Sequence, residues 1–297
     1  MSNRAIGRSL YISEHCVRIR LIRMSQQAFS FQTEQLSQLK IREELCFDGL
    51  ENFAKSQYDV NNIQQAIGRD SLFIYDFNFA CLNRKGYMSS WQKRRLAEIE
   101  AESGRYNPNA IRVATKDILQ RLHSAKCPTK DRMTLLSDEH FQYKRALKCD
   151  LTDCVFEHVT ISSKACRNFQ NILFSVNHVD LMIRQQVKAF SRETISFSKT
   201  AAAMCQKYAL YMIYKNFMIP QFTKKHVRRP NAHTQSPAQA LGVTTKILDF
   251  SDIFYKRSRL KETKTMNSDW AEYWNSQVPK KYLRDIKYIR NHKSVAA

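Results

Sequence analysis

The sequence predicts an α/β protein: a mixed sheet with flanking helices, preceded by a helical N-terminal segment and followed by a basic helical C-terminal region. Three observations favour this class. Short apolar runs alternate with longer stretches of helical periodicity. Gly and Pro number only six each in 297 residues, which excludes collagen-like and Pro-rich chains and favours long helices. Hydrophobic residues make up 43% and aromatic residues 11%, enough to fill a core, which argues against a disordered chain.

The N-terminal segment, residues 1–40, is expected to be helical. Ser13 is a candidate N-cap, and after it the apolar residues recur every three or four positions. Arg18, Arg20 and Arg23 give this helix a basic side. Such a helix suits the second helix of a helix-turn-helix, but no first helix is recognised before it. We interpret residues 1–40 as a partial DNA-binding module; an ordinary amphipathic surface helix is the alternative.

The next part of the chain, up to residue 123, is expected to hold three strands and two helices. The turn Gly68-Arg69-Asp70 predicts that the second and third strands pair as a hairpin. Pro108 is expected just inside the start of the second helix. The strands are predicted over 44–49, 62–68 and 71–77, and the helices over 89–102 and 110–123, with 84–106 as a helical insertion.

The rest of the chain is expected to alternate between strands and helices and then to become strongly basic. Strands are predicted over 133–138 and 154–159, an irregular loop over 160–175, and helices over 141–147, 176–190, 193–218 and 268–290. Residues 221–297 carry 16 Lys+Arg against 6 Asp+Glu. The domains are therefore predicted as 1–40, 41–220 and 221–297. Trp270 and Trp274 are expected in the core rather than as platforms for bases.

The charge of the chain restricts its partners. The 48 Lys+Arg and 27 Asp+Glu give a formal net charge of +21, which favours a polyanionic partner, most often nucleic acid. A solvated basic surface is the alternative. No stretch reaches the length of about 20 apolar residues that spans a bilayer, so no membrane partner is expected. The eight cysteines form no CxxC pair, which predicts free thiols in a reducing compartment such as the cytoplasm.

Three acids stand where carboxylates carry chemistry. Asp48 and Asp138 each follow a short apolar run, and we expect both to close a strand, where side chains reach the crevice in which α/β sheets place ligands. Asp180 lies inside an apolar helical stretch, where a carboxylate is costly unless it is paired or binds metal. The element order is that of the ribonuclease-H-like fold, in which three carboxylates hold two divalent metals. For each acid alone, a turn or surface role is the alternative.

This donor set suits Mg²⁺ or Mn²⁺, which take oxygen ligands. Two such ions, about 4 Å apart, activate an attacking oxygen and stabilise a leaving oxygen at phosphorus. The scarcity of Gly fits this interpretation, because no Gly-rich loop is present to hold a phosphate.

The chain also resembles a known family in several ordered motifs. It is similar to bacterial insertion-sequence transposases of the DDE type, over about residues 41–220. The matching segments are Ile41-Arg42-Glu43-Glu44-Leu45-Cys46-Phe47-Asp48-Gly49-Leu50-Glu51-Asn52-Phe53, Ser56-Gln57-Tyr58, Arg84-Lys85-Gly86-Tyr87-Met88, Leu136-Ser137-Asp138-Glu139-His140 with Tyr143, Val176-Asn177-His178-Val179-Asp180-Leu181-Met182-Ile183-Arg184, and Ser191-Arg192-Glu193-Thr194-Ile195-Ser196-Phe197-Ser198-Lys199.

The resemblance implies that Asp48 and Asp138 are the first two catalytic, metal-binding acids. For the third, Asp180 matches by position, while Glu193 is the competitor because Lys199 follows it six residues on. The family usually begins with a zinc-binding cysteine cluster and a complete helix-turn-helix. Neither is recognised here, which leads us to expect a truncated copy or the second frame of a frameshifted pair.

The basic residues near these acids are candidate DNA contacts, because Lys and Arg neutralise phosphates whatever the base sequence. We expect this role for Arg84, Lys85, Lys164, Arg184 and Lys199. The run Lys93-Arg94-Arg95 is as readily a solvated helix face. His140 is a candidate for orienting a phosphate, although a lone His is more often structural.

Together these observations predict a transposase that cleaves DNA strands and transfers them with two Mg²⁺ or Mn²⁺ ions. It is expected to act as a homo-oligomer on double-stranded DNA, at the element ends and the target. The alternative is an inactive relative that only binds element ends.

Overall fold

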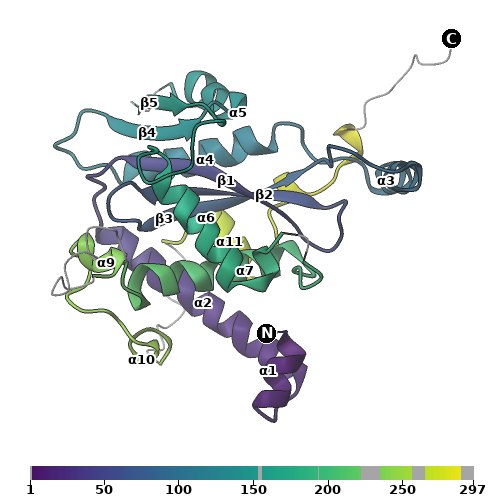
Figure 1. The fold of residues 1–297 in the computed structure, drawn as a ribbon, viewed down its shortest axis with the longest axis horizontal. Coiled ribbons are helices and arrows are strands. Elements are labelled where there is room, and N and C mark those ends of the chain that lie inside the picture. Colours follow the sequence, from purple (N-terminus) through teal and green to yellow (C-terminus); the bar gives the residue numbers. More distant parts are fainter. Residues whose placement is uncertain (1, 153–155, 193, 222–234, 256–264, 289–297) are drawn as a thin grey trace.

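The structure is a computed structural model that describes residues 2–152, 156–192, 194–221, 235–255 and 265–288. Within these ranges it contains a five-stranded mixed sheet flanked by helices, which confirms the predicted fold class (Figure 1). No helix in the same ranges combines the length and the apolar character needed to cross a membrane.

The strand order in the sheet is β3-β2-β1-β4-β5. Strands β1 and β2 pair antiparallel, as do β2 and β3, whereas β1–β4 and β4–β5 are parallel pairs. This order and these directions are compatible with a ribonuclease-H-like fold. The strands are β1 (Leu45–Phe53), β2 (Val60–Gly68), β3 (Ile74–Leu82), β4 (Met133–Asp138) and β5 (Phe156–Ile161).

The predicted hairpin is present, as β2 and β3, but the strand bounds differ from the expected ones. Strand β3 begins at Ile74, later than predicted, because Leu72 adopts a φ of 59° in the preceding turn. Strand β1 continues to Phe53, which pairs with Val60, because β2 accompanies it along its whole length. Asp48 therefore lies inside β1, and the expectation that it closes a strand is wrong. Asp138 does close β4.

Two helices follow β3, close to their predicted positions. Helix α3 (Ser90–Ser103) begins after the N-cap Ser89 and buries none of its residues. It protrudes from the body of the protein in Figure 1. Helix α4 (Ala110–Ser124) packs against β2 and β3. Its N-cap is Asn109, so Pro108 precedes the cap and does not lie inside the helix as expected.

Three further helices complete the centre of the fold: α5 (Phe141–Arg145), α6 (Phe174–Gln186) and α7 (Ala201–Ile213). The single helix predicted over 193–218 is wrong, because α7 begins only at Ala201. Thr200 caps it by accepting a hydrogen bond from the Ala203 amide at 3.1 Å. The described residues just before it are rich in Ser and Thr, whose hydroxyls compete with helical hydrogen bonds. Ser198 instead forms a parallel bridge with Ala54.

Both chain ends contribute helices around this centre. The N-terminal segment is helical as predicted: Ser13 caps α2, and the short α1 lies before it, where no separate first helix was recognised. The helix predicted over 268–290 is wrong from Asn275 to Tyr288, because Ser276 has a φ of 60° and Pro279 lacks a donor, and its last two residues lie outside the described ones. The described helices are α1 (Asn3–Ser9), α2 (Glu14–Gln38), α9 (Pro237–Ala240), α10 (Phe250–Phe254) and α11 (Ser268–Trp274).

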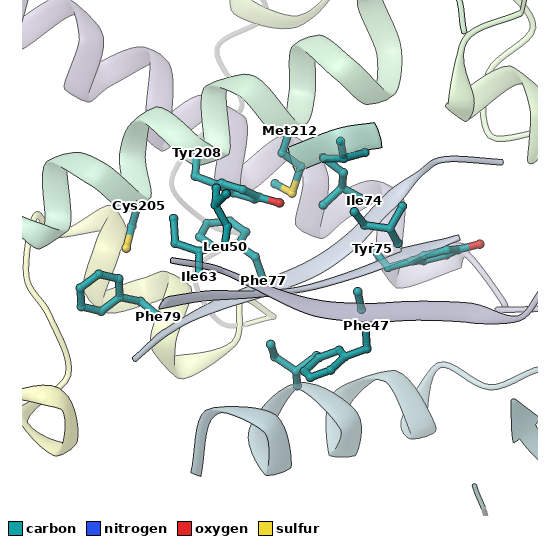
Figure 2. Close-up of a cluster of buried hydrophobic side chains, with 14 of the residues drawn as sticks. Phe47, Leu50, Ile63, Ile74, Tyr75, Phe77, Phe79, Cys205, Tyr208 and Met212 are labelled. Atoms are coloured by element: carbon teal, nitrogen blue, oxygen red, sulfur yellow. The ribbon is translucent and has the colours of Figure 1, made fainter. Parts of the chain in front are cut away.

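The hydrophobic core lies on both faces of the sheet. Figure 2 shows Tyr208 and Met212 of α7 above the strands and Phe47 of β1 below them. Phe77 of β3 stacks near Trp270, at 5.5 Å between ring centroids, and the Trp270 indole donates to the Phe77 carbonyl at 2.9 Å. Trp270 is therefore a core residue, as expected.

Candidate active site

Asp48 and Asp138 lie side by side because β1 and β4 are parallel neighbours. The last registered pair of these strands is Phe47 with Ser137, so each acid is the next residue along its strand. Strand β4 ends there, whereas β1 continues with β2. The two acids were predicted to lie at two strand ends. In the structure Asp138 ends β4, whereas Asp48 lies inside β1.

The surroundings of Asp48 include both other candidate acids. Its Oδ1 accepts a hydrogen bond from the Gly49 amide at 2.7 Å. Burial, together with the negative charges of Asp180 and Asp138, raises the pKa of Asp48 to about 7, and Arg167 opposes this shift. A carboxylate responds in this way where like charges are close and few counter-charges compensate.

Asp180 reaches the same place from α6, which packs against β1 and β2. Gln65 is the register partner of Asp48 on β2, and its Nε2 donates to Asp180 Oδ1. The Tyr208 hydroxyl of α7 donates in turn to Gln65 Oε1. Burial raises the pKa of Asp180 to about 6, against the Gln65 hydrogen bond and the charges of Arg184, Arg167 and Arg192.

Tyr143 is a common neighbour of the three acids. This α5 side chain is 2% exposed and packs edge-on against Phe47, at 5.1 Å between ring centroids. Burial and the negative charges of Asp48, Asp138 and Asp180 raise the pKa of its hydroxyl. Three acids from β1, β4 and α6 are therefore near enough to one buried tyrosine to raise the pKa of its hydroxyl.

The chemistry of these donors fits a hard divalent cation such as Mg²⁺ or Mn²⁺. Burial and the neighbouring carboxylates raise the pKa of Asp48 despite the charge of Arg167, so a bound cation would stabilise its ionised form. Among the residues that the structure describes, however, no three His, Cys, Asp or Glu side chains are close enough to hold a metal ion as they stand. Glu193, the competitor for the third acid, lies outside the described residues.

The predicted DNA contacts fall into two groups. Lys85 lies close enough to His140 for its charge to lower the pKa of that ring, although burial is the main cause, and Lys164 is exposed in the loop before α6. The others already contact protein groups. Arg84 lies over the Tyr58 ring at 5.4 Å and Lys199 over the Phe197 ring at 4.1 Å.

Arg184 has a different setting from the exposed cations. Its guanidinium donates to the carbonyls of Phe190 at 3.1 Å and Glu51 at 3.0 Å, which ties α6 to β1. Arg167 and Arg192 are exposed, and both lie near enough to Asp180 to lower its pKa. The exposed cations beside the acids are thus Arg167 and Arg192.

The sequence-based prediction missed Gln65 and Tyr208. Tyr208 is a buried residue of the largely apolar helix α7, and Gln65 is one of several buried polar residues in β2. The argument that singled out Asp180, a polar residue inside an apolar stretch, therefore does not mark Gln65. Nothing in the spacing connects Gln65 to Asp180, because 115 residues separate them.

Comparisons with known proteins give limited information. No protein-family model matches the sequence, and a search of curated proteins finds no significant match. One solved structure that aligns is a chain of the simian T-cell lymphotropic virus intasome in complex with PP2A regulatory subunit B56 gamma. The alignment has 10% identity and a TM-score of 0.31, and it covers 71% of this chain and 59% of that chain. A likeness this weak carries no argument about function.

Proposed function

We propose that this chain is a DDE-type transposase, which cleaves DNA strands and transfers the ends of an insertion sequence. The observation that carries the proposal is that the parallel strands β1 and β4 bring Asp48 and Asp138 side by side, with Asp180 near enough to raise the pKa of Asp48. The net charge of +21 supports a polyanionic substrate, and the motif resemblance over residues 41–220 supports the reaction class.

Asp48, Asp138 and Asp180 would hold two Mg²⁺ or Mn²⁺ ions. When bound, such ions activate the attacking oxygen and stabilise the leaving oxygen of the scissile phosphate. The chain itself supplies orientation and charge. Gln65 and Tyr208 hold one oxygen of Asp180 in place, and the exposed Arg167 is suited to a phosphate beside the acids.

The test is a Mg²⁺-dependent nicking assay on DNA carrying the terminal repeats of the element. Asp48→Asn and Asp138→Asn should each abolish strand cleavage, because a neutral amide is a poor ligand for a divalent cation, while DNA binding by gel shift persists. Asp131→Asn is the matched control, since Asp131 is exposed and is not one of the three candidate acids. Cleavage at the wild-type rate by either Asp48→Asn or Asp138→Asn would refute the proposal.

The third acid needs its own comparison. Asp180→Asn and Glu193→Gln should be assayed side by side, and we expect only the former to abolish cleavage. Cleavage retained by Asp180→Asn and lost in Glu193→Gln would transfer the role to Glu193.

A second candidate function is DNA binding without catalysis. It is favoured by the finding that no three acidic, His or Cys side chains of the described chain form a metal-binding group as they stand. It predicts that wild-type protein shifts terminal-repeat DNA but leaves it uncut in Mg²⁺ and Mn²⁺. Light scattering of the protein with and without that DNA tests the homo-oligomer that transposition requires.

A further inference from the structure

A cavity of about 440 Å³ lies beside the candidate active site, on the side of His140. Its lining includes residues that follow β3, residues that precede α4 and the first residues of α5. The three acids are not part of the lining. The link to them is His140, whose backbone amide donates to Asp138 Oδ1 at 3.0 Å. A volume of this size is typical of pockets for small organic groups.

One wall of the cavity is a pair of stacked rings. The His140 and Phe141 rings lie 5.3 Å apart between centroids, with 18° between their planes. Phe141 is 57% exposed, so its ring is accessible to a ligand in the cavity. A flat aromatic surface of this kind is suited to stacking against a nucleobase.

Gln142 lines the cavity and has a hydrogen-bond acceptor without a partner among the described residues. Gln142 is 5% exposed, and its Nε2 makes a long hydrogen bond of 3.5 Å to the Pro108 carbonyl. Its Oε1 is buried and finds no partner among the described residues. A buried acceptor without a donor is unfavourable. A ligand that brings an N–H group, as the edge of a base does, would relieve this.

Two cations line the same cavity. Lys85 is exposed and forms no ion pair within the described ranges, while Arg105 pairs with Glu100 at 3.1 Å. Glu51 is the acidic residue among the described residues of the lining. Lysine and arginine beside an aromatic wall are the groups that recognise a phosphate attached to a base.

We infer that this cavity binds one unpaired nucleotide of a DNA strand, with its base on the Phe141 ring, its edge toward Gln142 and its phosphate near Lys85 and Arg105. This inference rests on the proposed function for its source of nucleotide, since a strand that reaches Asp138 passes His140. It adds a specific recognition of unpaired DNA next to the site of cleavage, which the three acids by themselves do not provide.

The test compares a short duplex carrying a single-nucleotide bulge of 2-aminopurine with the same duplex fully paired. Wild-type protein should bind the bulged duplex about 5- to 100-fold more tightly by fluorescence anisotropy, the range that stacking one base on an aromatic ring gives. The 2-aminopurine emission should change on binding. Phe141→Ala should bring the affinity ratio close to one, and Gln142→Leu should lower it.

Phe250→Ala is the matched control, because Phe250 on α10 is similarly exposed, at 43%, and lies outside this cavity. It should keep the wild-type ratio. Equal affinity of wild-type protein for both duplexes, or an unchanged ratio in both Phe141→Ala and Gln142→Leu, would overturn the inference. Binding of free dAMP as tightly as the bulged duplex would also overturn it, because the ligand would then be a free nucleotide.

These binding measurements need no cleavage, so their outcome is separate from that of the nicking assay. A bulge preference without nicking would leave the cavity assignment standing and remove the transposase proposal. Nicking without a bulge preference would support the transposase proposal and overturn the cavity assignment.

Discussion

Lys215 is a buried cation whose charge should weaken the folded state, and replacing it with Met should stabilise the protein. This side chain is 3% exposed in the π-helical turn Tyr214–Met218 that continues α7. Burial alone lowers its pKa from 10.5 to about 8, with no carboxylate contributing. Met keeps a similar unbranched chain but carries no charge.

The size of the effect follows from the pKa difference. A shift of about 2.5 units corresponds to about 3 kcal/mol at 25 °C. Because the pKa is lower in the folded state, the unfolded chain binds more protons between pH 8 and 10.5. The charge penalty is therefore complete below pH 8, falls to about 1 kcal/mol near pH 9.5, and disappears above the unfolded pKa.

Urea unfolding of wild-type protein and Lys215→Met at about pH 7 and about pH 9.5 measures this difference. We expect the variant to gain up to about 3 kcal/mol at the lower pH and clearly less at the higher pH. Lys188→Met, at an exposed lysine, should change stability by less than about 0.5 kcal/mol at both. A destabilised Lys215→Met with the same free-energy difference at both pH values would contradict the reasoning.

Further substitutions test the contacts around the site and the helices. Gln65→Leu removes the buried donor of Asp180 and the acceptor of Tyr208, and should lower the free energy of unfolding by about 2 to 3 kcal/mol. Tyr208→Phe removes only the hydrogen bond to Gln65 and should lower the free energy of unfolding by less. Equal losses in the two variants would argue against the Tyr208–Gln65–Asp180 hydrogen bonds. Asp269→Asn removes one carboxylate from a network in which Arg121 keeps Asp76 and Lys281 keeps Asp117, and should cost about 2 kcal/mol in urea. Thr200→Ala removes the cap of α7 and should cost about 1 kcal/mol; an unchanged midpoint would show that the cap is dispensable.

Elements set by local signals could be predicted from the sequence. Strand β4 and helix α4 agree with their predicted positions because an apolar run and a helical period each marked one element. The helix expected over 193–218 was wrong because tertiary pairing decides that segment. Ser198 bridges to Ala54, and the Lys55 amide donates to the Ser198 carbonyl at 2.8 Å. No local pattern reports a partner so far away in the sequence.

In the candidate site, too, some features could be predicted from local sequence and others depend on tertiary contacts. Asp48 and Asp138 could be paired in advance, because parallel neighbouring strands bring equivalent positions together. The contact from Gln65 to Asp180 could not, since it depends on how α6 crosses β2. Arg184 was expected on DNA from its position next to Asp180. The structure shows its guanidinium bonded to two backbone carbonyls, a role that charge alone does not indicate.

The fully buried acids of the chain differ from the half-buried Asp48, Asp138 and Asp180 in their partners. Asp76 of β3 and Asp269 of α11 are both almost fully buried, and the chain gives them cations. Arg121 contacts Asp76 at 2.7 Å, and Lys281 contacts Asp269 at 2.7 Å. This network joins α11 to the sheet, which is what a structural pairing of buried charges achieves.

Asp48 receives no such partner among the described residues. Its hydrogen bond comes from the Gly49 amide, and the neighbouring charges that raise its pKa are carboxylates. A protein with 48 Lys and Arg residues has cations enough to neutralise this position, and it does so elsewhere in the same sheet. Uncompensated carboxylates are unfavourable for folding. Their retention beside the exposed Arg167 and Arg192 agrees with the proposal that a divalent cation and a phosphate bind here.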